Sequence, residues 1–371
     1  MSLPAMVPDA VKRWRLGTRV NAWMFRAYNP APHHLALFRM VYASFSLVLL
    51  FGYRFDWLAD FPDGFFYPPP GIARLFDGFP SAGLIWLLNG LAIGCNIALL
   101  VGWRTKLASI GMALCLYLLY SLLFSLGNIY HMVLWSTTPL VMAFSGWGNS
   151  LSLDAKRAGR EGPIQRWPIA LMALLVGFSF FTAGYAKLYG GWLMPESAVW
   201  QHFMRVFHAI GRDGLLAQYF AGFQFRPFWD LADWYVVLFQ SLFVVAALHP
   251  RSMRIFCSLA LLFHIMVLLV LTISFSIHVV VFLLFIDWRA LEATVPRVIA
   301  RLRAFINAAV RRIQPWMLLP VWAIYMWAFA AQDSYYLVDG PTWFELFVFA
   351  SAALGYASVP LLRLARRLRS L

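Results

Sequence analysis

The chain has 371 residues, of which 62% are hydrophobic and only 12% are charged. A soluble globular protein carries about 25% charged residues. Mean hydropathy is +0.69, and several apolar runs reach about 20 residues, the length that crosses a bilayer as a helix. The composition excludes an ordinary soluble domain and predicts an all-α fold, a polytopic integral membrane helical bundle with about ten transmembrane helices.

Charge and cysteine usage exclude further classes. The formal net charge is +14, but the basic residues lie between the apolar runs and no aromatic-basic RNA motif occurs, so we expect no nucleic-acid partner. Three cysteines, Cys95, Cys115 and Cys257, lie in apolar runs without CxxC spacing, which disfavours a disulfide framework. Residues 1–32 contain no apolar h-region, so we expect no cleavable signal peptide.

Ten apolar segments are predicted to span the membrane. They cover approximately residues 35–53, 83–102, 107–125, 130–147, 168–187, 231–249, 255–272, 275–288, 315–331 and 343–362. The eighth is short, and we expect it to pair with the seventh as a tight hairpin. The chain then divides into an amphipathic N-terminal segment (1–34), a transmembrane bundle (35–288), a basic amphipathic segment (289–314), and two last spans with a basic tail (315–371).

The distribution of basic residues predicts an orientation. With the N-terminus inside, 24 of the 30 Lys and Arg residues fall on the inner side. The positive-inside rule then places both termini in the cytoplasm, and we expect the protein in a bacterial inner membrane. Two outer segments, 53–80 and 190–233, are rich in aromatic residues. They are either an interfacial belt or a lid over a cavity open to the outer leaflet.

Two cytoplasmic segments resemble surface helices. Residues 289–312 mix Arg297, Arg301 and Arg303 with apolar residues such as Val298 and Leu302. This pattern is typical of a basic amphipathic helix lying on lipid, and residues 11–28 show it too. We expect membrane lipids as their partners and assign neither segment a chemical role.

Lys187 is the most informative ionisable residue. It lies at the outer end of an apolar run that starts near Pro168. An ammonium near lipid is costly, and such residues usually face a bundle interior or a cavity. A buried lysine can also become a neutral base. The alternative is snorkelling, in which a lysine at a helix end lifts its charge into the headgroups. Position alone leaves both open.

Three histidines lie within or at the mouths of predicted spans. His131 opens the fourth span on the same outer side as Lys187, His264 lies midway through the seventh, and His278 begins the eighth near the outer surface. A lone intramembrane histidine is more often a helix–helix hydrogen-bond partner than a ligand. Because the three histidines and Lys187 lie mostly in the outer half of the membrane, we expect them to form a polar pocket there.

Other ionisable groups and motifs point less clearly to function. Arg39 opens the first span and Asp287 ends the eighth, where snorkelling and ion pairing are the simpler explanations. The three histidines show no HxxH, HxxxH or HExxH pattern, and no carboxylate lies beside them at helical spacing, so no metal site is predicted. Walker, GxGxxG, GxSxG and CxxCH motifs do not occur, which disfavours a nucleotide or covalent haem.

Several short segments, taken in order, resemble the horizontally transferred transmembrane (HTTM) family, to which vitamin K-dependent gamma-glutamyl carboxylase belongs. The similar segments are Leu35-Ala36-Leu37-Phe38-Arg39, Gly102-Trp103-Arg104-Thr105, His131, Ser152-Leu153-Asp154, Ala183-Gly184-Tyr185-Ala186-Lys187-Leu188 with Trp192-Leu193, and Phe263-His264. The resemblance covers roughly residues 30–290, and the stretch around Lys187 is its most specific part.

The resemblance implies a membrane enzyme. Lys187 corresponds to the base that deprotonates a reduced, vitamin K-like quinone for reaction with oxygen, and His131 corresponds to a polar group lining the quinone pocket. These two are the expected catalytic residues. We expect contacts with the quinone cofactor from His264, His278, Arg39, Tyr185 and Trp192.

Other functions remain open. The family's carboxylase has a large lumenal domain that grips its peptide substrate, and the present chain has two further spans in that place. The second substrate, a peptide or a small molecule, is therefore undetermined. One alternative is a quinone- or lipid-binding module without turnover. Another is a membrane maturation, immunity or assembly factor.

Overall fold

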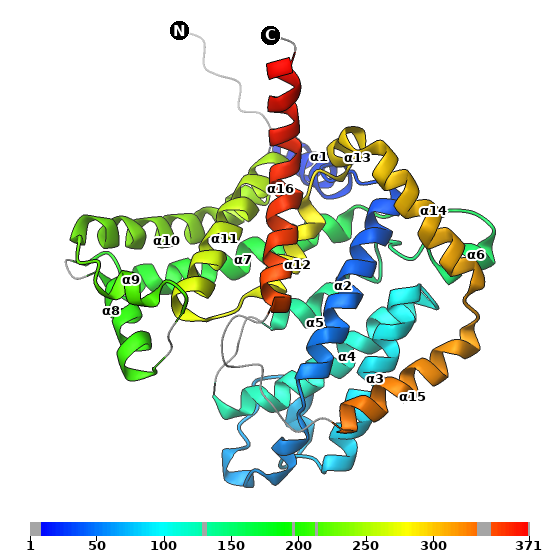
Figure 1. Ribbon diagram of the computed structural model, residues 1–371, viewed down its shortest axis with the longest axis horizontal. Helices are drawn as coiled ribbons and strands as arrows, with labels where there is room; N and C mark the ends of the chain where they lie inside the picture. The colour runs from blue at the N-terminus through cyan, green and yellow to red at the C-terminus, as the bar shows by residue number, and fades with distance from the viewer. Residues whose placement is uncertain (1–8, 128–131, 195–196, 212–213, 332–342, 370–371) are drawn as a thin grey trace.

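The computed structural model describes residues 9–127, 132–194, 197–211, 214–331 and 343–369, and every regular element within them is a helix (Figure 1). The prediction of an all-helical membrane protein is confirmed to that extent. Six helices are long and apolar enough to cross a membrane. They are α2 (Pro32–Gly52), α3 (Ala82–Val101), α4 (Thr105–Leu123), α7 (Trp167–Tyr189), α10 (Arg226–Ala246) and α11 (Pro250–Leu271).

The four other predicted spans do not count as full spans on their own, because each is short, bent against a neighbour, or apolar over only part of its length. They are α5 (Val133–Met142), α12 (Ser276–Phe282) with the 3-10 turn η6 (Leu283–Phe285), α15 (Leu318–Ala331) and α16 (Trp343–Arg369). Helix α5 has 10 residues, which at a rise of 1.5 Å per residue covers about half of a 30 Å hydrocarbon core. Helix α15 meets α14 (Pro296–Arg312) at 90°, and the pair counts at most as a seventh span. The predicted number of ten spans is therefore not confirmed.

The remaining elements are short or lie at the ends of the spans. The helices are α1 (Asp9–Arg26), α6 (Leu153–Ala158), α8 (Ala198–Met204), α9 (Ala217–Ala221) and α13 (Trp288–Thr294). The tight turns are η1 (Asp56–Asp60), η2 (Asp63–Phe65), η3 (Ile72–Leu75), η4 (Phe124–Leu126), η7 (Pro315–Met317) and the π-helical turn η5 (Arg205–Ala209).

On α14, Ile299, Ile306 and Val310 are buried, whereas Val298, Leu302 and Phe305 are exposed.

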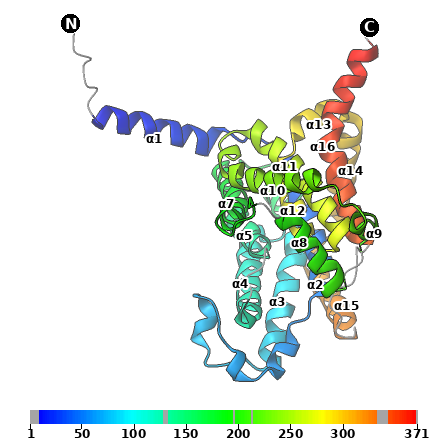
Figure 2. The same ribbon diagram turned by 90° about the vertical axis from the view of Figure 1, so that its left-hand side faces the viewer.

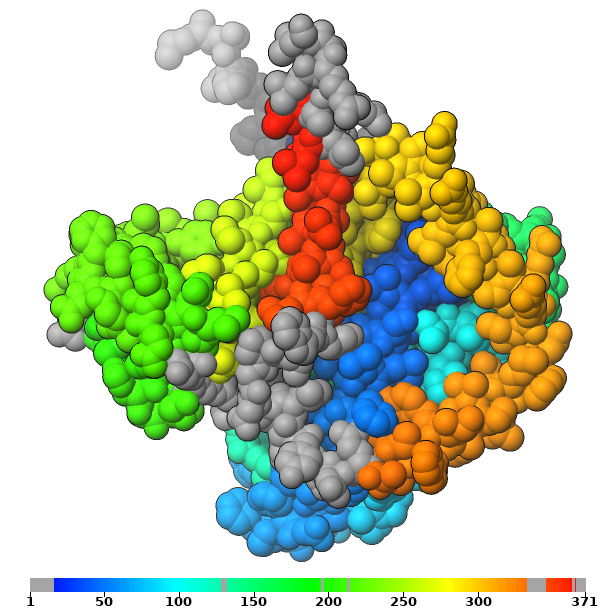
Figure 3. All heavy atoms as spheres, viewed as in Figure 1, coloured from blue at the N-terminus to red at the C-terminus, as the bar shows by residue number. Residues whose placement is uncertain are grey.

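The helices form two groups that share a common core. Helices α7, α10 and α11 lie on one side, with α8 and α9 over their ends, and α2, α3 and α4 lie on the other (Figure 1). Helix α5 packs on both α4 and α7, and α12 packs on α2, α5 and α16, so these two short helices join the groups. In Figure 2, α1 extends away from the bundle. Figure 3 shows α2 at the surface between α16 and the bent helix pair α14 and α15.

Helices α7 and α10 make the most extensive contact in the molecule. Gly177 and Gly184 lie two turns apart on α7, and a Cβ on either would press against the backbone of α10 at Val244 and Ser241, at 2.9 and 2.6 Å. Small residues at a helix interface let backbones approach closely. Phe180, between the two glycines, is buried and packs on side chains of α10. This contact fixes the position of the C-terminal end of α7.

A second tight junction joins α2, the α3–α4 turn and α6. The guanidinium of Arg39 is completely buried, and its Nη2 donates to the Leu151 carbonyl at 2.8 Å. Gly102 ends α3 with φ of +72°, and a Cβ there would overlap Arg39 Nη1. The turn can therefore accept only glycine beside this arginine.

Asp154 completes the same junction by capping α4. Its carboxylate accepts from the backbone N–H groups of Arg104 and Thr105 at 2.9 and 2.7 Å, and from the Thr105 hydroxyl at 2.7 Å. The N–H groups at a helix N-terminus need acceptors, and a negative charge there is favourable. Three segments that are far apart in the sequence, 35–39, 102–105 and 152–154, thus meet in one structural junction.

Candidate functional site

A cavity of about 1050 Å³ lies among α5, α7, α8, α10, α11 and α12. Ligand pockets typically measure about 300–1,000 Å³ and are mainly apolar with a few placed polar groups. Its lining is dominated by aliphatic and aromatic side chains. The larger polar side chains that line it are Lys187, His202, Gln240, His264 and His278. The cavity therefore has the size and composition of a site for a hydrophobic ligand.

Lys187 lies at one end of this cavity, in the last turn of α7. Its Nζ lies 3.4 Å from the Ala183 carbonyl and 5.0 Å from the centroid of the Trp192 ring. The second contact has the geometry of a cation–π interaction. Among the residues that the structure describes, no carboxylate forms an ion pair with Lys187. Within the described part of the chain, the ammonium form thus lacks a counter-charge at this end.

His202 on α8 lines the same cavity. Burial lowers the pKa of this imidazole, and the positive charges of Arg205 and Lys187 lower it further. The lowered pKa favours the neutral ring at neutral pH. His202 is therefore a hydrogen-bonding group near Lys187 rather than a second cation.

A pair of histidines occupies a buried part of the cavity wall. His264 and His278 are 1% and 7% exposed, and His264 Nε2 lies 3.3 Å from His278 Nδ1. Phe275 stacks on the His264 ring at 4.5 Å. One ring must donate to the other at this distance, so the two tautomers are coupled. The pair offers a polar surface inside an otherwise aromatic wall.

The two polar regions of the cavity lie well apart. Phe180 contacts both His264 and His278, with ring centroids at 5.8 and 5.6 Å. Lys187 follows Phe180 by seven residues on the same helix, which corresponds to about 10 Å along the helix axis. A ligand that contacts both regions must therefore be elongated.

The rim of the cavity is apolar and exposed. Phe178, Leu231 and Leu262 line the cavity and are 56%, 68% and 56% exposed. In a membrane, such side chains face acyl chains rather than water. A hydrophobic ligand can then enter laterally from the lipid.

The structure brings together four of the residues expected at the site. Lys187, Trp192, His264 and His278 all line the cavity. His131 lies outside the described residues, so the structure does not test whether it lies close to Lys187.

The structure does not bring Arg39 and Tyr185 to this cavity. Arg39 is held in the α2–α6 junction. Tyr185 is 54% exposed and lies near Phe181 and Tyr189. Cavity-lining Ala183 and Lys187 are four residues apart and share a helix face, whereas Tyr185 points to another side.

Sequence reasoning missed several lining residues from the aromatic outer segment. Val199, His202, Phe203, Phe220, Phe228 and Trp229 all line the cavity. The segment therefore covers one side of the cavity. The only sequence signal was its density of aromatic residues, which is also typical of an interfacial belt.

Comparison of the chain with protein families, curated proteins and solved structures finds no match. The fold and the cavity define a helical membrane protein with a large, mainly apolar cavity.

Proposed function

We propose that this protein binds a reduced quinone in the α7–α10–α11 cavity and that Lys187 removes a hydroxyl proton from it. The observation that carries the proposal is an apolar cavity of about 1050 Å³ with a lysine that has no carboxylate partner among the described residues. The ordered segments that resemble the HTTM family support the same chemistry.

The proposed reaction begins with proton transfer. The neutral amine of Lys187 takes the proton, which leaves an ammonium beside a quinol anion. An apolar surrounding without a counter-ion disfavours a charged lysine before the substrate binds, and the new anion supplies the missing counter-charge afterwards. Dioxygen would then add to the ring of this anion, and cleavage of its O–O bond would leave one oxygen atom in an epoxide of the oxidised quinone and the other as an alkoxide. The strongly basic oxygen product would act on a second substrate, a peptide or a small molecule.

The aromatic lining suits this chemistry because a strong base must be kept from water. Phe203 and Trp229 are buried beside the cavity, with stacked rings 5.7 Å apart. The exposed apolar rim at Phe178 and Leu262 provides a route from the lipid that does not require a water-filled channel.

Oxygen uptake by the purified protein tests this proposal. We expect the wild-type protein in lipid nanodiscs to consume oxygen when a reduced naphthoquinone is added, at a rate above that of empty nanodiscs. The measurement uses an oxygen electrode, with a water-soluble hydroquinone as a control that should not partition into the cavity. An uptake rate equal to that of empty nanodiscs with every membrane-soluble quinol would rule out turnover.

A second candidate function is ligand binding without turnover. It is favoured by the contact between the Lys187 ammonium and the Trp192 ring, because cation–π attraction stabilises the charged lysine. A charged Lys187 would hold an anionic or carbonyl group instead of removing a proton. Binding of the quinone in the absence of oxygen uptake would identify this function.

We also propose that both termini face the cytoplasm of a bacterial inner membrane. The inner segments predicted from charge contact one another: Lys156 donates to the Arg311 carbonyl at 2.9 Å, and Arg39 reaches Leu151. Two outer elements are likewise joined, by the 2.7 Å bond from the Val199 N–H to Asp233. Helix α1 and the C-terminal end of α16 lie at the end of the molecule opposite η1 and η2 (Figures 1 and 2).

Cysteine labelling tests the orientation. Tyr67 is 83% exposed in the expected outer segment, and Arg160 is exposed in the expected inner one. In a chain whose native cysteines are replaced by alanine, we expect a membrane-impermeant maleimide added to intact cells to label Tyr67→Cys but not Arg160→Cys. The opposite pattern, or labelling of both, would contradict the orientation. Labelling of both variants in lysed cells is the control for reactivity.

A further inference from the structure

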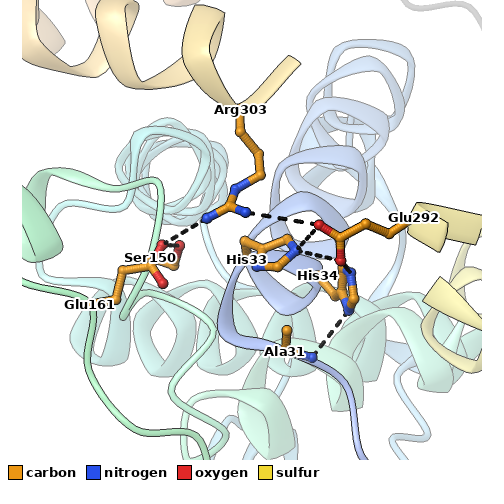
Figure 4. A network of polar contacts seen from close by, with 7 residues as sticks. All are labelled: Ala31, His33, His34, Ser150, Glu161, Glu292 and Arg303. Carbon is orange, nitrogen blue, oxygen red and sulfur yellow. Dashed lines mark hydrogen bonds and ion pairs between the residues drawn. The ribbon is translucent and has the colours of Figure 1, made fainter. Parts of the chain in front are cut away.

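A second polar cluster lies at the other end of the bundle, away from the cavity. His33 and His34, in the first turn of α2, both point at the carboxylate of Glu292 on α13 (Figure 4). His33 Nε2 lies 3.2 Å from each carboxylate oxygen, and His34 Nε2 lies 3.0 Å from Oε2. The histidines are 7% and 1% exposed. Two buried rings thus converge on one carboxylate that is distant in sequence.

The spacing of these three groups matches the edges of a metal coordination shell. The two Nε2 atoms and a carboxylate oxygen all lie within 4.8 Å of one another. Zinc binds nitrogen and oxygen ligands at about 2.0–2.2 Å, so neighbouring ligands in a tetrahedral site are about 3.3 Å apart. The observed nitrogen–oxygen separations of 3.0 and 3.2 Å are close to this value. The separations between the nitrogen and oxygen atoms are thus compatible with a shared metal ion.

We propose that His33, His34 and Glu292 bind a divalent transition metal ion, with zinc as the best fit to the donors. Two imidazoles and one carboxylate are a recurring donor set of zinc sites that keep the fourth position open. The Glu292 side chain is 32% exposed, so water can occupy that position. The metal would join the start of α2 to α13.

Charges of both signs surround the cluster, with Arg303 and Arg289 as the cations and Glu161 and Glu292 as the anions. Arg303 on α14 lies 3.9 Å from Glu292 and 3.7 Å from Glu161. Glu161 therefore offsets the charge of Arg303, and Glu292 remains available to a metal ion. Although partial burial opposes it, the two histidines lower the pKa of Glu292. The carboxylate is thus present as the anion that a metal requires.

Metal binding requires one local rearrangement. The Ala31 N–H donates to His34 Nδ1 at 3.1 Å, so the proton of the neutral ring lies on Nε2. A metal at Nε2 moves that proton to Nδ1 and breaks the bond from Ala31. The loss of one hydrogen bond is small beside the free energy of three metal–ligand bonds. Without a metal, the same residues form a hydrogen-bonded cluster that joins α2 to α13. This structural role is the competing explanation for their arrangement.

Zinc content of the purified full-length protein tests the site. After incubation with zinc and removal of free metal, we expect about one zinc per chain by mass spectrometry. His33→Ala and Glu292→Gln should each weaken binding at least tenfold in competition with a chromophoric chelator. His208→Ala is the matched control, because His208 is exposed on η5, and it should keep full binding. Cobalt substitution should give the intense visible absorption of a tetrahedral complex.

A hydrogen-bonded cluster that binds no metal predicts different results. Equal zinc in wild type and Glu292→Gln, or no zinc and no tetrahedral cobalt band in wild type, would overturn the metal site. The wild-type cobalt spectrum decides the question even where a variant fails to fold. Zinc should also raise the unfolding temperature of wild type but not of His33→Ala, and an equal rise in both would overturn the site as well.

Discussion

Lys187→Arg is expected to fold, insert and bind quinone, yet to lose oxygen consumption with a reduced naphthoquinone. Arginine keeps the positive charge and roughly the length of lysine, but its guanidinium cannot give up a proton under these conditions. Removal of a general base typically lowers a rate by about 10²–10⁴. Uptake should therefore fall to the level of empty nanodiscs. The oxygen electrode measures the rate, and quinone binding is measured separately on the same preparation.

Tyr185→Phe is the matched control for this experiment. Tyr185 lies two residues from Lys187 on the same helix but is exposed and does not line the cavity. Its oxygen uptake should equal that of wild type. Equal uptake by Lys187→Arg and wild type would remove Lys187 as the base. Loss of uptake in both variants would indicate damage to α7 rather than loss of a proton acceptor.

Gly102→Ala is expected to destabilise the protein strongly. Gly102 has φ of +72°, and an added Cβ would overlap both Arg39 Nη1 and Ser152 Cβ. A left-handed conformation costs a non-glycine residue about 1–2 kcal/mol, and overpacking typically costs about 1–3 kcal/mol. We expect a loss of about 2–5 kcal/mol in the free energy of unfolding, from the sum of these two costs.

The measurement is thermal or denaturant unfolding in detergent, together with the yield of monodisperse protein. Gly83→Ala, near the start of the same helix α3, is the control, because no atom lies within 4 Å of the position of its Cβ and its φ is not positive. Gly83→Ala should leave stability unchanged or raise it slightly. Similar stabilities for the two variants would show that the Arg39 junction can relax at little cost.

The positions of the helices were predictable, but their role as full spans was not. Apolar runs identify helices because every backbone polar group in lipid must be satisfied within the helix. The predicted 168–187 and 255–272 agree closely with α7 and α11. The predicted span at 130–147 contains the 10-residue α5, with Pro139 inside it. Hydropathy does not distinguish a full crossing from a short helix buried against neighbours, so the count of ten spans is not confirmed.

The candidate site was predictable only in part. The outer-side bias of Lys187, His264 and His278 predicted a shared pocket, and these residues do line one cavity. The sequence could not place Arg39, because an ionisable residue at the mouth of a span looks the same whether it faces a ligand or a carbonyl. The direction of its guanidinium depends on Leu151, which is 112 residues away.

Composition and periodicity by themselves determined that this chain is helical, where its apolar helices lie, and that a lysine ends one of them. These properties are local, because helix formation and membrane partitioning depend on consecutive residues. Only the tertiary structure decided which polar groups come together: Lys187 and His202 line one cavity, and His33 contacts Glu292 across 259 positions. Such contacts depend on how helices pack, which is set by glycines such as Gly184 and by the angles between helices rather than by spacing along the chain.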